Sequence, residues 1–239
     1  MEFWPIVILF SSCFLGGLSV FFFKKDSSQR LKLILSFSGA YLFSITILHL
    51  IPEVYQHAGH DHSIGLFVLG GFLFQILLEQ FSQGIEHGHI HKHSHDQPTF
   101  PYGIMLSLCL HAFLEGMPLA KGYQNELLFG IALHHIPAAF ALGSVLLQNH
   151  LRKANIILLL VLFSVMSPAG YLLSNGLSNG SMGNIDQYFD RIMAVVIGIF
   201  LHISTTILFE SSVDHHFNFK KLMAVLAGIA VALINFLLH

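Results

Sequence analysis

Charged residues are scarce in this sequence. Lysine, arginine, aspartate and glutamate make up 10% of its 239 residues, whereas an average soluble domain carries roughly 25%. Hydrophobic residues make up 54%, and the formal net charge is only -2. The sequence also lacks the basic face that a nucleic-acid-binding protein needs. This composition excludes a mainly water-soluble chain that binds nucleic acid, and it indicates a membrane protein.

Cysteine is almost absent as well. The two cysteines, Cys13 and Cys109, both fall inside apolar segments, and their spacing matches no paired motif. The sequence therefore excludes a disulfide framework and a thiolate zinc cluster. We expect both thiols to act as small hydrophobic packing residues.

Long apolar runs are abundant. A helix that spans a bilayer needs roughly 20 apolar residues. Eight segments of about this length can be drawn, at 3–23, 31–52, 64–83, 102–120, 126–147, 154–174, 187–209 and 220–238. The first lacks the positive n-region of a signal peptide, so we expect it to be retained as a span. The sequence predicts an all-α integral membrane protein, with residues 1–239 forming one transmembrane domain of eight helices.

Positive charges are unevenly distributed between the two ends of these spans. Cytoplasmic loops accumulate lysine and arginine. If the loop after the first span is cytosolic, all eleven of these residues lie inside except Lys121 and Arg191. We therefore expect both termini outside the cytosol and a histidine-rich cytosolic loop at about 84–101. The compact length and short loops favour a bacterial inner membrane.

Histidine is over-represented, with 17 residues. The fourth span contains "HAFLEG", in which His111 and Glu115 are four residues apart and so share one helix face. A carboxylate near the centre of a bilayer costs on the order of 3 kcal/mol on insertion scales and is functional by default. Imidazole nitrogen and carboxylate oxygen are both zinc ligands. The pair predicts part of a metal site, with a hydrogen-bonded tie between helices as the alternative.

The fifth span supplies two more histidines at a similar depth. His134 and His135 are followed by Pro137, and Pro118 closes the fourth span. Proline removes a helix hydrogen bond and its ring crowds the preceding turn, so we expect both helices to be kinked. Irregular backbone is tolerated in membranes where it lines a cavity or is buried in protein. The sequence therefore predicts a metal site between spans four and five, formed by His111, Glu115, His134 and His135.

Other polar residues give weaker signals. His49 and Glu53, four apart near the outer end of span two, fit an access role and a plain interfacial role equally well. Glu79 is expected to reach cytosolic water, and His202 fits core hydrogen bonding and pathway lining equally. On the outer side, metal capture is expected from the loop histidines His57, His60 and His62. On the cytosolic side, the alternating His87, His89, His91, His93 and His95 fit weak metal capture or sensing, with a disordered polar linker as the alternative.

Several of these segments resemble the ZIP (Zrt/Irt-like) metal transporters. The resemblance covers nearly the whole chain and includes "HLIPE", "HAFLEGMPLA", "HHIPAAFALG", "SPAG" and "GIFLH". It implies a ZIP-like eight-helix bundle that moves a divalent ion into the cytosol, typically Zn²⁺ and sometimes Fe²⁺, Mn²⁺ or Cd²⁺. It also implies that His111 and Glu115 match the span-four ligands and His134 the first span-five ligand. His135 matches a neighbouring position that is often acidic or otherwise polar.

The sequence departs from this family where many members place further polar ligands. Ala112, Ala138 and Ile207 stand at those positions. One carboxylate and two or three imidazoles leave a single bound divalent ion with a net charge of about +1, whereas two ions require more carboxylates. We predict one metal ion per transport site, with His135 replacing a missing carboxylate. Two ions bridged by Glu115 in a metal-soaked structure would refute this prediction.

Three other functions share part of the pattern. An intramembrane zinc-dependent hydrolase would use the same residue types, but the sequence has no HExxH motif and no further central carboxylate that could act as a base. A metal efflux carrier or a metal sensor would also use histidines. We expect a transporter rather than an enzyme. Its expected partners are the lipid bilayer and the ion, with a homodimer as an open option. An imidazole-rich site favours zinc over hard ions such as Mg²⁺ or Ca²⁺.

Overall fold

The computed structural model describes residues 3–22, 28–59, 61–82, 84–85, 101–120, 124–149, 151–178, 186–210 and 219–238. The secondary structure in these ranges is helical. The α-helices are α1 (Trp4–Leu18), α2 (Ser28–Ile45), α3 (Ile51–Ala58), α4 (Ile64–Ser82), α5 (Tyr102–Gly116), α6 (Gln124–Gln148), α7 (Lys153–Ser178), α8 (Asp186–Glu210) and α9 (Phe219–Leu238). Short irregular helices extend or join some of them, at Ser19–Phe21, Thr46–Leu50 and Met117–Ala120.

Eight helical segments are long and apolar enough to cross a membrane. They run over Trp4–Phe21, Leu31–Ala58, Ile64–Ser82, Tyr102–Ala120, Asn125–Gln148, Lys153–Gly176, Tyr188–Phe209 and Phe219–Leu238. The predicted all-α membrane fold with eight spans is confirmed. Cys13 is buried and Cys109 partly buried, and neither is in a disulfide, as the sequence predicted.

The second span is longer than the sequence predicted. Between α2 and α3 the chain forms a π-helical turn at Thr46–Leu50, and the helix then continues to Ala58. Pro52 lies in the first turn of α3 and cannot donate a backbone hydrogen bond to the preceding turn. A π-helical turn widens the backbone locally and is frequent at functional sites. His49 lies within this turn.

The two expected proline kinks take different forms. Pro118 lies in the 3₁₀ turn Met117–Ala120 that follows α5, so the fourth span does change its backbone there. Pro137 lies inside α6, which continues as one helix from Gln124 to Gln148. Proline removes only one hydrogen bond of the ladder, the one to the carbonyl of Leu133, and the neighbouring helices hold the rest of α6 in place.

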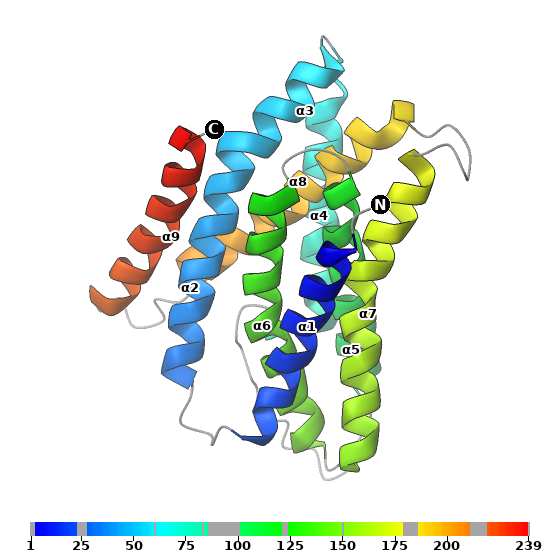
Figure 1. Cartoon of the computed structure of the whole chain (residues 1–239), viewed down its shortest axis with the longest axis vertical. Coiled ribbons are helices and arrows are strands. Elements are labelled where there is room, and N and C mark those ends of the chain that lie inside the picture. The colour runs from blue at the N-terminus through cyan, green and yellow to red at the C-terminus, as the bar shows by residue number, and fades with distance from the viewer. Residues whose placement is uncertain are drawn as a thin grey trace.

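The helices form two groups that pack against each other (Figure 1). In one group α1 packs on α6 and α7, and α5 packs on α7. In the other group α4 packs on α8, and α2 packs on α8 and α9. Contacts of α2 with α6 and of α4 with α5 join the two groups. α5 and α6 therefore lie where the groups meet, with other helices covering them.

α5 and α7 approach each other closely near the candidate site. A Cβ atom at Gly116 would collide with the carbonyl oxygen of Ser167, and one at Gly170 would collide with the carbonyl oxygen of Phe113. Only glycine permits two backbones to approach this closely, which is the small-residue packing common in membrane helices. Gly116 follows Glu115 directly, so this contact fixes the end of α5.

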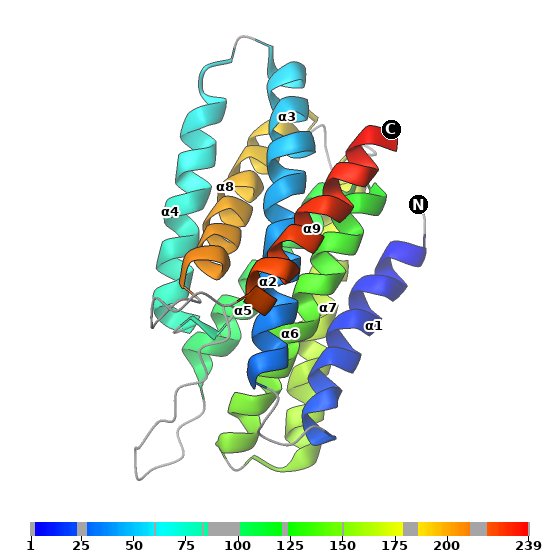
Figure 2. The ribbon, with the colours of Figure 1, turned by 90° about the vertical axis from the view of Figure 1, so that its left-hand side faces the viewer.

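Both termini lie toward the same end of the bundle as the connection between α3 and α4 (Figure 2). An even number of spans requires the two termini to share one side of the membrane. α4 and α9 bury the least of the eight spans, and their exposed side chains are large and apolar, such as Leu69, Leu73, Leu226 and Leu233. These faces suit contact with lipid.

Candidate metal site

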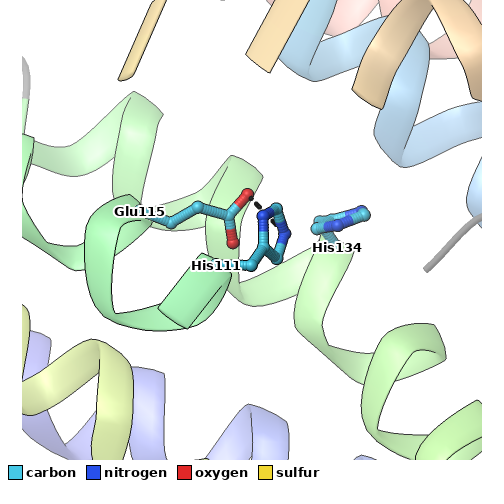
Figure 3. Close-up of side chains that lie close together, drawn as sticks. All are labelled: His111, Glu115 and His134. Atoms are coloured by element: carbon cyan, nitrogen blue, oxygen red, sulfur yellow. Dashed lines mark ion pairs between the residues drawn. The ribbon is translucent and has the colours of Figure 1, made fainter. Parts of the chain in front are cut away.

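The structure brings His111, Glu115 and His134 together from α5 and α6 (Figure 3). His111 and Glu115 lie one helical turn apart on the face of α5 that is turned toward α6, as the four-residue spacing predicted. His134 reaches them from α6, and the rings of His111 and His134 meet edge to face with centroids 5.9 Å apart. One nitrogen from each histidine and one oxygen of Glu115 all lie within 4.8 Å of one another.

The spacing of these atoms suits a tetrahedral ion. Two ligands of zinc, at bond lengths of about 2.1 Å, lie about 3.4 Å apart in a tetrahedron. The distance from His111 Nε2 to Glu115 Oε1 is 3.3 Å. Small side-chain shifts would bring the His134 nitrogen into the same geometry. The three residues can therefore hold one zinc ion, with a fourth position left for another ligand.

Burying these polar groups costs free energy unless other polar groups or an ion bind them. Glu115 and His134 are 0% exposed and His111 is 1% exposed. Oε1 of Glu115 and Nε2 of His111 contact each other at 3.3 Å, but neither atom, nor Nδ1 of His111, has a hydrogen-bond partner among the described residues. Buried polar atoms are nearly always hydrogen-bonded, and an exception requires an explanation. A bound cation would satisfy Oε1 and one nitrogen of His111 at once.

His135 lies beside these three residues and is hydrogen-bonded to one of them, Glu115. Its Nε2 is 2.8 Å from Glu115 Oε2, and its side chain is 1% exposed. It is not one of the three residues whose ligand atoms converge. The assignment of all four residues as ligands stays a prediction.

Buried apolar side chains occupy the three positions at which many family members have further polar ligands. Ala112, Ala138 and Ile207 are buried, at 1%, 1% and 3% exposure. Ile207 packs against α2 at Gly39, where an added Cβ atom would lie 2.8 Å from Ile207 Cγ2. No second carboxylate comes from these three positions, which agrees with a single ion. That number of ions also stays a prediction.

Glu79 is partly exposed, and it also contacts a histidine of another helix. Its Oε2 lies 3.3 Å from Nε2 of His202, with side-chain exposures of 22% and 9% respectively. The His202 ring also meets the edge of Phe72, with centroids 5.0 Å apart. Glu79 on α4 and His202 on α8 therefore form an ion pair between helices. The sequence allowed core hydrogen bonding for His202, but it could not identify Glu79 as the partner, because the two spans are far apart in the chain.

His49 is also less exposed than an interfacial residue. It is 6% exposed, and its ring meets the edge of Phe236 on α9 at 5.3 Å between centroids. Glu53, one turn further on, is partly buried. The two residues thus follow the inner side of the second span toward its end, and the access role predicted for them stays open.

The loop histidines can be placed only in part. His57 and His62 are exposed, on either side of the turn that joins α3 to α4. His60 and the five histidines at 87–95 lie outside the described residues. Near His62, hydrogen bonds from Ser63 hold the pKa of Asp61 below its usual value, and the Arg191 guanidinium, 3.8 Å away, adds a smaller effect. Asp61 therefore stays ionised at neutral pH and forms an ion pair with Arg191.

The family model described as ZIP Zinc transporter matches residues 3–102 and 83–235. The chain belongs to this family. The similarity to this family thus extends beyond the fourth and fifth spans to nearly the whole sequence. The eight apolar helices are those of a multi-pass membrane protein of the ZIP family.

Several ZIP relatives show the extent of the similarity. Zinc transporter ZIP1 of Homo sapiens is 26% identical over 252 residues, covering 85% of this chain and 77% of that protein. Zinc transporter ZIP9 of Xenopus tropicalis is 29% identical over 167 residues, covering 61% of this chain and 53% of that protein. Zinc transporter ZIP1 of Bos taurus is 32% identical over 136 residues, covering 54% and 41%. The chain spans about half the length of the ZIP9 relatives it matches.

Proposed function

We propose that this protein carries a divalent metal ion, zinc foremost, across the membrane into the cytosol. The observation that carries the proposal is the convergence of His111, Glu115 and His134 within 4.8 Å. These residues lie near the middle of the spans Tyr102–Ala120 and Asn125–Gln148. The printed names of the relatives, zinc transporters ZIP1 and ZIP9, support the same function.

The burial of the ligands supports transport rather than catalysis. All three ligand residues are at most 1% exposed, so in this conformation an ion could neither enter from one side nor leave to the other. A carrier needs such a closed state between two open ones, reached when one part of the bundle rocks against another. A hydrolase would instead need a path for its substrate to an open coordination position. Such a carrier moves the ion by exchanging the ion's ligands and carries out no covalent reaction.

The distribution of positive charge supports an orientation of the protein in the membrane, whereas uptake into the cytosol is what the resemblance to the ZIP family implies. α7 begins at the end of the bundle away from the termini, and α9 begins about halfway along the bundle and runs toward the termini (Figure 1). Lys220 and Lys221 lie in the first turn of α9, on the side away from the termini. The positive-inside rule puts this end in the cytosol. His57 and His62 then lie on the outer side, where they would meet the ion first.

The experiment that tests this function is zinc-65 uptake into proteoliposomes. We expect saturable uptake by the wild-type protein and an uptake at least about tenfold lower for His134→Ala. The reason is that one of three protein ligands is lost, and each 1.4 kcal/mol of lost binding is a factor of ten. His150→Ala, which changes a histidine that lies in the sequence between the fifth and sixth spans, serves as the matched control. Normal uptake by His134→Ala would contradict the assignment of the site.

A further inference from the structure

The two oxygens of Glu115 face different partners. Oε1 lies 3.3 Å from His111 Nε2, a spacing typical of two ligands on one zinc ion. Oε2 lies 2.8 Å from His135 Nε2. This second distance is that of a strong N–H···O hydrogen bond and is shorter than the roughly 3.4 Å that separates two ligands of a tetrahedral zinc ion. His135 is therefore placed as a donor to Glu115.

We take Glu115 as the acceptor in this hydrogen bond, because an ionised carboxylate can only accept hydrogen bonds. Nε2 of His135 then carries the proton that it donates. A protonated ring nitrogen has no lone pair with which to bind a metal. His135 Nδ1, the other ring nitrogen, is not part of the group whose ligand atoms converge. In this arrangement His135 holds Glu115 while His111 and His134 face the ion.

The surroundings keep the His135 ring in place. Its ring lies 6.3 Å from that of Phe163 on α7, which is itself buried. The backbone of the next residue, Ile136, packs directly against Gly16 of α1. A Cβ atom added to Gly16 would lie 2.7 Å from the Ile136 carbonyl oxygen. α1 and α7 therefore restrict both the backbone and the ring, and His135 has little room to turn toward another partner.

We propose that His135 is a positioning residue that keeps Glu115 a one-oxygen ligand and so makes the site selective for zinc. The proposal rests on the proposed function and deepens it. With Oε2 held by His135, only Oε1 is available to the ion, which gives two nitrogens and one oxygen. This set suits four-coordinate zinc. Mn²⁺ prefers six ligands rich in oxygen and would gain from both carboxylate oxygens. Releasing Oε2 should therefore favour Mn²⁺ relative to Zn²⁺.

Two substitutions of His135 by amides of similar size distinguish a hydrogen-bond donor from a metal ligand. The side-chain amide of His135→Gln places an N–H group near the position of Nε2, whereas the shorter His135→Asn cannot reach Glu115. Neither amide replaces an imidazole as a zinc ligand. We expect His135→Gln to keep its KM for zinc within about threefold of the wild type. We expect His135→Asn to raise it by about 10- to 100-fold, the usual effect of losing a group that orients a ligand. The ratio of Mn²⁺ to Zn²⁺ uptake should rise only in His135→Asn.

A spectroscopic measurement completes the test. Purified protein is loaded with one equivalent of Co²⁺, with the five histidines at 87–95 replaced by serine, and its visible absorption is recorded. We expect wild type and His135→Gln to give the same tetrahedral spectrum, and His134→Gln to lose it. If His135→Gln loses uptake and spectrum as His134→Gln does, His135 is a ligand and the proposal is wrong. If His135→Asn behaves as the wild type, the hydrogen bond has no role and the proposal is also wrong. If the wild-type protein moves no metal, the proposed function fails instead.

Discussion

The Glu115→Ala variant is expected to lose zinc uptake by at least about 100-fold. Glu115 is the one carboxylate among the three residues that converge, and it is completely buried. Without it, a doubly charged ion would face only neutral imidazoles in a site away from water. Removing one partner from a buried pair of opposite charges typically costs about 3–5 kcal/mol, and each 1.4 kcal/mol is a factor of ten in binding. Zinc-65 uptake into proteoliposomes at low zinc concentration measures this loss.

Two further variants show whether the loss of zinc uptake comes from the missing negative charge and whether it depends on the position of the carboxylate. Glu115→Gln keeps an oxygen in place but removes the negative charge, and we expect it to be nearly as inactive as Glu115→Ala. Glu126→Gln changes a carboxylate in the first turn of α6, outside the site, and should transport as the wild type does. Uptake by Glu115→Ala at the rate of Glu126→Gln would mean that the ion does not bind at Glu115.

The Gly116→Ala variant should be strongly destabilised. Its added Cβ atom would collide with the carbonyl oxygen of Ser167, a backbone atom that cannot move aside as a flexible side chain can. α5 and α7 would have to separate. We expect a loss of about 3 kcal/mol, at the upper end of the usual range for overpacking, and a thermal midpoint lower by roughly 6–12 °C. Thermal unfolding of the detergent-solubilised protein measures this shift.

A matched glycine provides the control for this experiment. An added Cβ atom at Gly70 on α4 would meet nothing within 4 Å. Gly70→Ala should therefore leave the midpoint unchanged or raise it slightly, because alanine favours a helix by up to about 1 kcal/mol over glycine. Equal midpoints for the Gly116→Ala and Gly70→Ala variants would show that α5 and α7 are not tightly packed in the membrane.

The eight spans could be predicted closely from the sequence because they depend on local properties. A run of roughly 20 apolar residues forms a helix in a bilayer whatever its neighbours, since its backbone must satisfy its own hydrogen bonds there. The predicted ends agree with the observed ones within a few residues, except that the second span continues to Ala58. That extension includes polar residues such as Glu53 and His57, which lowered its hydropathy.

The partners within the candidate site were only partly predictable. The four-residue spacing of His111 and Glu115 put both on one face of α5, and His134 was expected at the same depth from its place in the fifth span. The different contacts of His134 and His135 were not predictable, because adjacent residues on a helix point about 100° apart and the rotation of α6 depends on its packing. The ion pair of Glu79 with His202 was missed for the same reason.

The sequence by itself determined the membrane fold, the number of spans and the residue types at the candidate site, since hydrophobicity and helical spacing are local quantities. The tertiary structure alone decided which faces meet. The close contact at Gly116 and Ser167 holds α5 against α7, and the contact of Ile136 with Gly16 holds α6 against α1. These contacts between distant parts of the chain turn His111 toward Oε1 of Glu115, bring His134 beside them and leave Oε2 to His135.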